Sequence, residues 1–459
     1  MTTTLIIVIL MLACASVFFS AGKVTVEGFF AGEAMDGSKP SLLTLVFSQV
    51  TTWIFARSLL TAAILGFYYG IGGALAYTAY YLSFFTGAFI VDHIRFKHGF
   101  HSVQDFLTDN FGATGTSAYN FVIGLRLLSE VFANLIVVGI VFGADGSALY
   151  FYAASAAAIF TLGYSMIGGM HSSLRTDVFQ LSVFLVMLIV LMIALLGSPD
   201  WSVGLVFETV KPVKDPGWVL LGVAMLQVIS YPMHDPVMMD RGFLADRQTT
   251  WKSFMHAGWL SMLCIFLFSL LGVYAGVHAG AGEEMLDVLT RTLGETTMLI
   301  FSIALIISAI STLDSALSSA SKLIVKDMKL MSESLFNGRL AMVLFMLGGL
   351  VFVFLDTKEL YAAVAISGTA SMFLTPVILF CVLGGKRVSL WAFHVAFVAA
   401  ISGAVLYYME TSGLGFMTEL LGVEHKYSKL LIICFTVLGV GNGAFALGVK
   451  TTNVKVQRA

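Results

Sequence analysis

Hydroxyl side chains line one side of a strongly apolar stretch and could together bind a small cation. The stretch runs from Ser308 to Asp327 and reads SAISTLDSALSSASKLIVKD. At about 100° per residue, one helical stripe holds Ser308, Ser311, Thr312, Ser315, Ser319 and Lys322. Asp314 lies at the edge of this stripe, although an acid within a membrane span costs roughly 2.5–3.5 kcal/mol. Serines that only let helices pack closely are the alternative, but a carboxylate among hydroxyls favours an ion site.

Two arginines within apolar stretches are further candidates for chemistry. Arg57 follows a polar run, residues 48–52, and no carboxylate lies within one helix turn of it. Such a run predicts a locally unwound helix whose free carbonyl groups line a cavity. Arg126 has Glu130 one turn later, so these two side chains could neutralise each other as a purely structural ion pair or could belong to a site.

A second predicted helix break lies between two prolines. Pro232 and Pro236 interrupt backbone hydrogen bonding, and His234 and Asp235 lie between them. This segment is a candidate for binding or gating. The alternative is a helix end that meets the cytoplasm, with Arg241 as an interfacial residue.

The stretch 168–180, GGMHSSLRTDVFQ, predicts a tight turn followed by a carboxylate inside the membrane. Gly168 and Gly169 form the turn, and Asp177 lies about one helix turn into the next apolar run. Taken alone, Asp177 is explained by the favourable interaction of a carboxylate with a helix N-terminus.

Composition then limits the class of protein. The 459 residues are 58% hydrophobic and 11% charged, with a mean hydropathy of +0.92, which indicates an all-α polytopic membrane protein embedded in a lipid bilayer. The net charge of −2 and the lack of a basic patch argue against a nucleic-acid partner. We find no nucleophile–base pair, metal cluster or fingerprint of an organic cofactor, so an enzyme is not expected.

The apolar runs predict about thirteen membrane spans. They cover roughly 4–21, 42–66, 72–96, 118–143, 149–168, 176–197, 217–237, 254–280, 294–325, 338–356, 359–384, 389–409 and 429–449. The first run has no positively charged start, so it is expected to be a retained helix and not a signal peptide. Lys and Arg are concentrated in alternate loops, which predicts an outside N-terminus and a cytoplasmic C-terminus in the plasma (bacterial inner) membrane.

Two of these stretches resemble signatures of the sodium/solute symporter family. GGMHSSLRTDVFQ resembles a GG-(aliphatic)-x-A-V-x-x-T-D-x-x-Q signature, and SAISTLDSALSSASKLIVKD resembles an A-x-x-S-[ST]-x-x-S helix followed by a serine-rich stretch. The family includes bacterial proline, sialic-acid and sugar symporters. The resemblance implies a single transporter domain over residues 1–459 with a leucine-transporter-like fold. It would have a leading helix (4–21), two inverted five-helix repeats (42–197 and 217–384) and two trailing helices (389–449).

The resemblance also implies binding sites for sodium. The main site would use the carbonyl oxygens of Phe47, Val50 and Ser308 and the hydroxyls of Ser311 and Thr312. A possible second cation site would use Asp177, Asp314 and Ser315. The family usually has a small or hydroxyl residue at position 314, so Asp314 could strengthen that site or make it protonatable.

Solute is expected to bind beside the two breaks. The candidate residues are Gln49, Thr52, Trp53, Arg57, Tyr77, Tyr80, Tyr81, Arg126, Gln227, Tyr231 and His234. Proline-type members have an aspartate at the position of Gln49, which argues against proline as the solute. Arg57 would need a counter-charge and the aromatic residues suit a small apolar body, so a small carboxylate or amino acid is favoured.

The resulting prediction is a sodium-coupled symporter that imports a small organic solute by alternating access. One alternative is a proton-coupled transporter of the same fold that uses Asp314 or Asp177. The other is a transporter-like solute sensor that signals through a separate partner. No obligatory protein partner is expected for the symporter.

Overall fold

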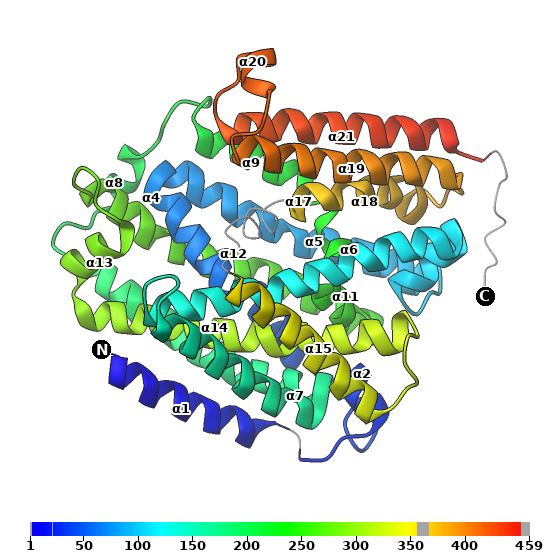
Figure 1. The fold of residues 1–459 in the computed structure, drawn as a ribbon, viewed down its shortest axis with the longest axis horizontal. Coiled ribbons are helices and arrows are strands. Elements are labelled where there is room, and N and C mark those ends of the chain that lie inside the picture. Colours follow the sequence, from blue (N-terminus) through cyan, green and yellow to red (C-terminus); the bar gives the residue numbers. More distant parts are fainter. Residues whose placement is uncertain (1, 21, 356–366, 451–459) are drawn as a thin grey trace.

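The structure is a computed structural model, and it describes residues 2–20, 22–355 and 367–450. Within these ranges every element is a helix, apart from one isolated bridge between Val388 and Val449. Most of the long helices run along the longest axis of the molecule, and α1 begins at the end opposite to that where α21 finishes (Figure 1).

The first half of the chain contains α1 (Thr2–Phe19), α2 (Val26–Ala31), α3 (Leu42–Trp53), α4 (Ala56–Ala79), α5 (Ser83–Val91), α6 (Val103–Phe142), α7 (Ala148–Leu196) and α8 (Val203–Glu208). The second half contains α9 (Pro216–Gln227), α10 (Tyr231–His234), α11 (Pro236–Gly242), α12 (Arg247–His278), α13 (Met285–Leu293), α14 (Glu295–Lys322), α15 (Leu335–Phe354), α17 (Ser367–Ala370), α18 (Leu374–Pro376), α19 (Leu390–Thr411), α20 (Met417–Leu421) and α21 (Lys426–Gly448). Short 3-10 or π-helical turns extend several of them, at Tyr80–Leu82, Asp92–Lys97, Leu323–Asp327, Ser371–Phe373 and Val377–Leu383.

The predicted all-α membrane architecture is confirmed. Eight helical stretches in the described ranges are long and apolar enough to cross a membrane, and four shorter apolar helices accompany them. Three of the long stretches are interrupted by a glycine with non-helical backbone angles, Gly70 in α4 (φ 56°), Gly112 in α6 (φ 68°) and Gly169 in α7 (φ 54°). Gly70 and Gly169 lie at predicted boundaries between neighbouring spans. The total of thirteen spans stays a prediction, and residues 359–366 of the predicted span 359–384 lie outside the described ranges.

Both predicted helix breaks are present, but the first lies later than expected. The polar run 48–52 is helical, and α3 ends only at Trp53, where Ile54 and Phe55 leave helical geometry before α4 begins. Side-chain hydroxyls account for the later break. Thr51 donates to the carbonyl of Phe47 within α3, so its hydroxyl is hydrogen-bonded without any unwinding of the helix. The second break separates α9, α10 and α11, with Asp235 in an extended conformation.

Helices α4 and α12 lie backbone against backbone. A Cβ atom on Gly66, Gly272 or Gly276 would overlap a main-chain oxygen of the other helix. Small residues allow this close approach, and van der Waals contact of the two backbones takes the place of interlocking side chains.

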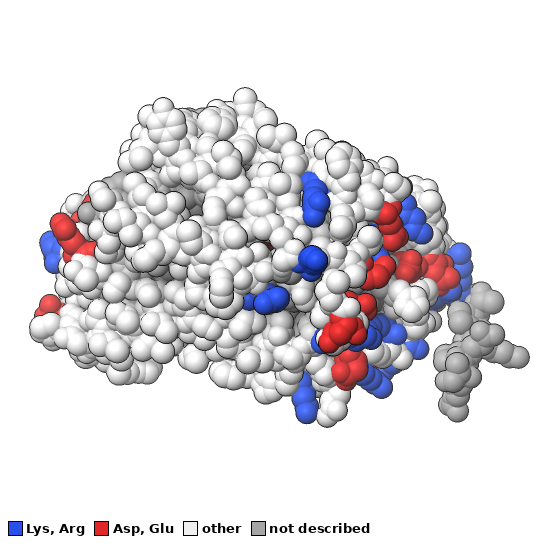
Figure 2. All heavy atoms as spheres, turned by 90° about the horizontal axis from the view of Figure 1, so that it is seen from below, with Lys and Arg blue, Asp and Glu red and all other residues white. Residues whose placement is uncertain are grey.

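Charged side chains leave a broad uncharged band on the surface. Figure 2 shows a few charged residues at one end of the long axis on that face, then a broad uncharged band, then a larger group that extends from near the middle to the other end. Large apolar side chains are exposed on the surface, among them Phe18, Ile159 and Leu447. An exposed apolar band between charged ends is what a lipid bilayer requires of a helical bundle.

Candidate functional site

The hydroxyl stripe of α14 faces the break between α3 and α4. The hydroxyl of Ser308 donates to the carbonyl oxygen of Ile54, and Thr312 Oγ1 lies 3.4 Å from the carbonyl oxygen of Thr51. Thr312 also donates to the carbonyl of Ser308, 3.0 Å away. Helical residues rarely offer free carbonyl oxygens to a neighbour, so the break supplies oxygen ligands that an intact helix would not.

Two of the carbonyls predicted to bind sodium are engaged within their own helix. The oxygen of Phe47 accepts the Thr51 hydroxyl at 2.9 Å, and the oxygen of Val50 accepts the backbone N–H of Ile54 at 2.9 Å. The carbonyls in contact with the α14 hydroxyls therefore belong to Thr51 and Ile54, one helix turn further along. These carbonyls lie beyond the predicted ones because the break comes later in the chain than predicted.

Asp177 of α7 lies beside this oxygen-rich gap and is fully buried. Ser311 of α14 donates to its Oδ1 at 2.8 Å, and Ser48 of α3 donates to its Oδ2 at 2.5 Å. Thus the predicted main-site hydroxyl Ser311 and the predicted second-site carboxylate Asp177 are in direct contact.

Asp314 of α14 is also fully buried, and four hydroxyls surround it. Its Oδ2 accepts hydrogen bonds from Tyr164 at 2.8 Å and Thr176 at 2.9 Å. Its Oδ1 accepts hydrogen bonds from Ser173 at 2.8 Å and Ser315 at 3.3 Å. The three residues predicted for a second cation site, Asp177, Asp314 and Ser315, thus meet in one network between α7 and α14.

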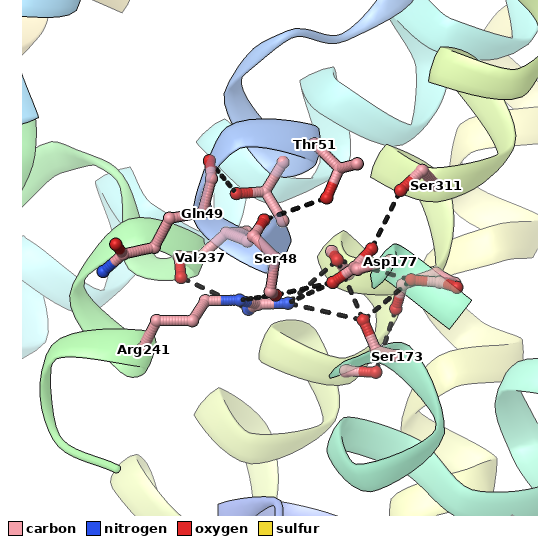
Figure 3. Close-up of polar contacts among 12 residues, drawn as sticks. Ser48, Gln49, Thr51, Ser173, Asp177, Val237, Arg241 and Ser311 are labelled. Atoms are coloured by element: carbon pink, nitrogen blue, oxygen red, sulfur yellow. Dashed lines mark hydrogen bonds and ion pairs between the residues drawn. The ribbon is translucent and has the colours of Figure 1, made fainter. Parts of the chain in front are cut away.

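Arg241 of α11 extends into the same network, which the sequence did not predict. Its side chain has no solvent exposure, whereas an interfacial residue at a helix end was one of the two alternatives that the sequence left open. The guanidinium points toward Asp177, Ser48 and Ser173 (Figure 3). The interfacial alternative does not hold for Arg241, because the short helix α11 that follows the break is buried in the bundle.

A cavity of about 190 Å³ lies on the other side of the α3–α4 break. Eight of the residues predicted to contact solute line it, namely Trp53, Arg57, Tyr77, Tyr80, Tyr81, Arg126, Gln227 and Tyr231. Tyr231 of the second break packs edge-on against Trp53 of the first, with ring centroids 5.3 Å apart. Both breaks therefore contribute to one cavity.

Three predicted solute contacts do not line this cavity. Gln49 is fully buried in α3, and its amide points away from Asp177 (Figure 3). Thr52 donates to the carbonyl of Gln49 at 3.0 Å. His234 hydrogen-bonds through Nε2 to the hydroxyl of Ser367 at 2.7 Å, and Ser367 itself lines the cavity.

Hydrogen bonds fix several of the aromatic walls. Tyr80 donates to the side-chain oxygen of Gln227 at 2.9 Å, and Tyr81 donates to the carbonyl of Trp53 at 2.7 Å. Tyr77 donates to the hydroxyl of Ser58 at 2.9 Å. Because these hydroxyls are satisfied, the rings can present apolar surface to a solute without leaving buried polar groups unpaired.

Arg126 combines a structural ion pair with a place on the cavity wall. Its guanidinium lies 3.1 Å from Glu130, as the sequence spacing suggested, and 3.2 Å from Asp235 of the second break. Both carboxylates are buried. Arg126 thereby ties α6 to the link between α10 and α11, and two carboxylates already share its charge.

No sequence pattern predicted the part of the cavity wall that the trailing helices form. Tyr407 of α19 and Tyr427 and Leu430 of α21 line the cavity, as does Phe55 at the first break. A polar motif would have drawn attention to these helices, but isolated tyrosines in apolar runs are too common to do so.

This arrangement defines the class of fold. Two interrupted helices meet at the centre of an all-helical bundle, with a cavity on one side and an oxygen-lined gap on the other, as in leucine-transporter-like transporters. No protein-family model matches the chain, and no curated protein matches its sequence.

Solved structures establish the same fold. A Na⁺-coupled sialic acid symporter in a substrate-bound outward-open state, with a novel Na⁺ site, is similar over 98% of this chain and 98% of its own, with a TM-score of 0.72 and 15% identity. Mhp1, a nucleobase-cation-symport-1 family transporter in a closed conformation with bromovinylhydantoin bound, is similar over 89% of this chain and 93% of its own, with a TM-score of 0.55 and 14% identity. The chain has a transporter fold, and the predicted leucine-transporter-like architecture is confirmed at this level.

Proposed function

We propose that the protein is a sodium-coupled symporter that imports a small organic solute, a carboxylate or an amino acid, by alternating access. The observation that carries this proposal is the two-sided break between α3 and α4. On one side the carbonyls of Thr51 and Ile54 face the hydroxyls of α14, and on the other Trp53 and Arg57 line the cavity.

The sodium assignment rests on the chemistry of the gap. Hydroxyl and carbonyl oxygens are hard donors suited to Na⁺, and the Asp177 carboxylate supplies a negative charge beside them. The described residues contain no group of three or more His, Cys, Asp or Glu side chains that could hold a metal ion, so transition-metal binding has no support there.

The nature of the solute is inferred from the cavity wall. Arg57 and Arg126 line the cavity, and the described residues of its wall include no Asp or Glu. Either guanidinium could pair with a solute carboxylate, and Arg126 also shares its charge with Glu130 and Asp235. Aromatic rings form much of the remaining wall, so the solute should also carry an apolar body.

The two sides of the break give a physical basis for coupling. Sodium at the carbonyls would hold the ends of α3 and α4 in place, and the same short segment positions Trp53 for solute. Sodium should therefore raise solute affinity, and solute should raise sodium affinity by the same factor. One charge moving inward across 100 mV would supply about 2.3 kcal/mol for solute accumulation.

We also propose the two inverted repeats, 42–197 and 217–384, as the framework of this movement. The breaks lie near the start of each repeat, as this fold requires. The end of the molecule where α21 finishes would face the cytoplasm of a bacterial cell.

A thermal-unfolding screen of the purified protein tests the proposal. Small carboxylates, amino acids and sugars would each be compared in sodium and in potassium. We expect a carboxylate-bearing solute to raise the unfolding temperature only in sodium, because each ligand completes the binding site of the other. Stabilisation by solute that is equal in the two salts would contradict sodium coupling.

Proton coupling is the second candidate, and the burial of two carboxylates favours it. Asp177 and Asp314 are surrounded by hydroxyls, which can also hydrogen-bond to a protonated acid. Uptake into proteoliposomes that follows a pH gradient in sodium-free buffer would support this alternative. Solute binding without any uptake would support a sensor.

A further inference from the structure

The guanidinium of Arg241 lies where the sequence predicted a second cation. The predicted ligands Asp177 and Ser315 lie against it, and the third, Asp314, is linked to it through Ser315; all four side chains are fully buried. Nη2 of Arg241 donates to Ser315 Oγ at 2.8 Å and lies 3.8 Å from the carboxylate of Asp177. A positive charge of the protein itself is thus present at the position proposed for an ion.

Each contact of Arg241 with a hydroxyl continues to a carboxylate. Nε donates to Ser48 at 3.0 Å, and Ser48 donates to Asp177 at 2.5 Å. Nη2 also lies 3.3 Å from Ser173, and Ser173 donates to Asp314 at 2.8 Å. The guanidinium therefore donates to Ser315, which is one of the predicted ligands, and to Ser48 and Ser173, whose contacts are shown in Figure 3.

The charges of this network leave room for one mobile cation. Asp177 and Asp314 supply two negative charges when both are ionised, and Arg241 supplies one positive charge. The adjacent acid, Asp240, belongs to a separate ion-pair cluster, in which Lys322 lies 2.8 Å from Asp240 and 2.9 Å from Asp327. Unbalanced charge is costly inside a protein, and a single sodium ion at the neighbouring main site would neutralise the network.

We propose that Arg241 is the permanent occupant of the second cation site, so that the protein couples its solute to a single sodium ion. The proposal rests on the proposed function for the identity of the mobile ion, but the role of Arg241 as a fixed cation does not depend on that identity. The guanidinium also links α11 to α3, α7 and α14, as a metal ion bound at this position would.

Binding of ²²Na⁺ to the full-length protein in detergent tests the proposal. We expect the wild type to bind one ion per chain. Arg241→Gln removes the fixed charge and keeps an amide that can hydrogen-bond, so it should bind two. The double variant Arg241→Gln with Asp314→Asn loses one charge of each sign, so it should bind one ion again.

A variant with the same exchange at a surface site serves as the control. Arg247 pairs with Asp92 at 2.6 Å, and its side chain is 60% exposed. Arg247→Gln should bind the same number of ions as the wild type, and size-exclusion chromatography would report whether each variant is folded.

If Arg241→Gln does not fold, the single variant Asp314→Asn tests whether Arg241 acts as the fixed cation. It should weaken ²²Na⁺ binding at least about tenfold, because the fixed cation then neutralises the remaining acid.

The outcomes separate this inference from the proposed function. One ion bound by the wild type and one by folded Arg241→Gln, with equal affinity, would overturn the role of Arg241 and leave sodium symport intact. No ion bound by the wild type but one bound by Arg241→Gln would refute sodium coupling and uphold the fixed cation. Unchanged binding by Asp314→Asn would also overturn the inference.

Discussion

Removing two hydroxyls from α14 should abolish the effect of sodium while the fold persists. The perturbation is Ser311→Ala together with Thr312→Ala. Ser311 donates to Asp177 at 2.8 Å, and Thr312 lies between the carbonyls of Thr51 and Ser308. Both oxygens are candidate ligands of the ion, and neither methyl group that replaces them can bind it.

The expected magnitude follows from the number of ligands lost. An interaction of a hydroxyl with a charged group contributes about 1.5–3 kcal/mol, so two contribute roughly 3–6 kcal/mol. At about 1.4 kcal/mol per tenfold change, sodium affinity should fall by roughly 10²–10⁴. At a sodium concentration one hundred times the wild-type Kd, a stabilisation of about 2.7 kcal/mol should fall to about 0.4 kcal/mol or less.

The assay is the sodium-dependent change in unfolding temperature, with potassium as the reference salt. The absolute unfolding temperature is a poor measure, because Asp177 also loses a hydrogen-bond donor in the variant. Ser318→Ala with Thr297→Ala is a matched control on α14. Ser318 and Thr297 donate only to carbonyls one turn earlier, those of Asp314 and Leu293. A sodium effect that survives in full in Ser311→Ala with Thr312→Ala would refute the assigned site.

Three further predictions concern packing and the cavity. Gly272→Ala should lower the unfolding temperature by several degrees or prevent folding, because a Cβ would overlap the backbone of α4, whereas Gly439→Ala, with open space around it, should have little effect. Arg126→Met should cost roughly 3–5 kcal/mol in unfolding measurements, since Glu130 would remain as a buried charge without its partner; an unchanged stability would contradict this. Arg57→Gln should weaken binding of a carboxylate solute by about tenfold to a hundredfold in calorimetry and leave the effect of sodium alone unchanged; equal loss of both effects would argue against a solute role.

The sequence was most informative where a polar group interrupts an apolar run. A membrane helix can carry such a group only at a cost, so Asp314 stood out as a member of an ion site and Arg126 as a candidate for chemistry. The structure places Arg126 against Glu130, as the spacing suggested, and Ser311 against Asp177. The breaks were predictable for the same reason, because prolines and polar runs disturb helices in identifiable ways.

Three-dimensional proximity was the part that the sequence could not supply. Arg241 lies next to a helix end in the sequence, where a basic residue is expected to meet water. Only the direction of α11 after the second break brings it to Asp177. The position of the first break was also missed, since Ile54 and Phe55 are apolar and carry no signal. The sodium ligands expected at Phe47 and Val50 stay a prediction, while the carbonyls that face the α14 hydroxyls are those of Thr51 and Ile54.

The contact between α4 and α12 has a mechanical consequence. Helices separated by long side chains can slide as those side chains change rotamers, but α4 and α12 touch through their main chains at Gly66, Gly272 and Gly276. No flexible side chains separate the two backbones at these glycines, so α4 and α12 must move together as one rigid unit. If the cavity opens to the other face of the membrane, the backbone must then change conformation at the ends of this rigid unit. The candidate hinges are the glycine at Gly70 and the non-helical residues Ile54 and Phe55.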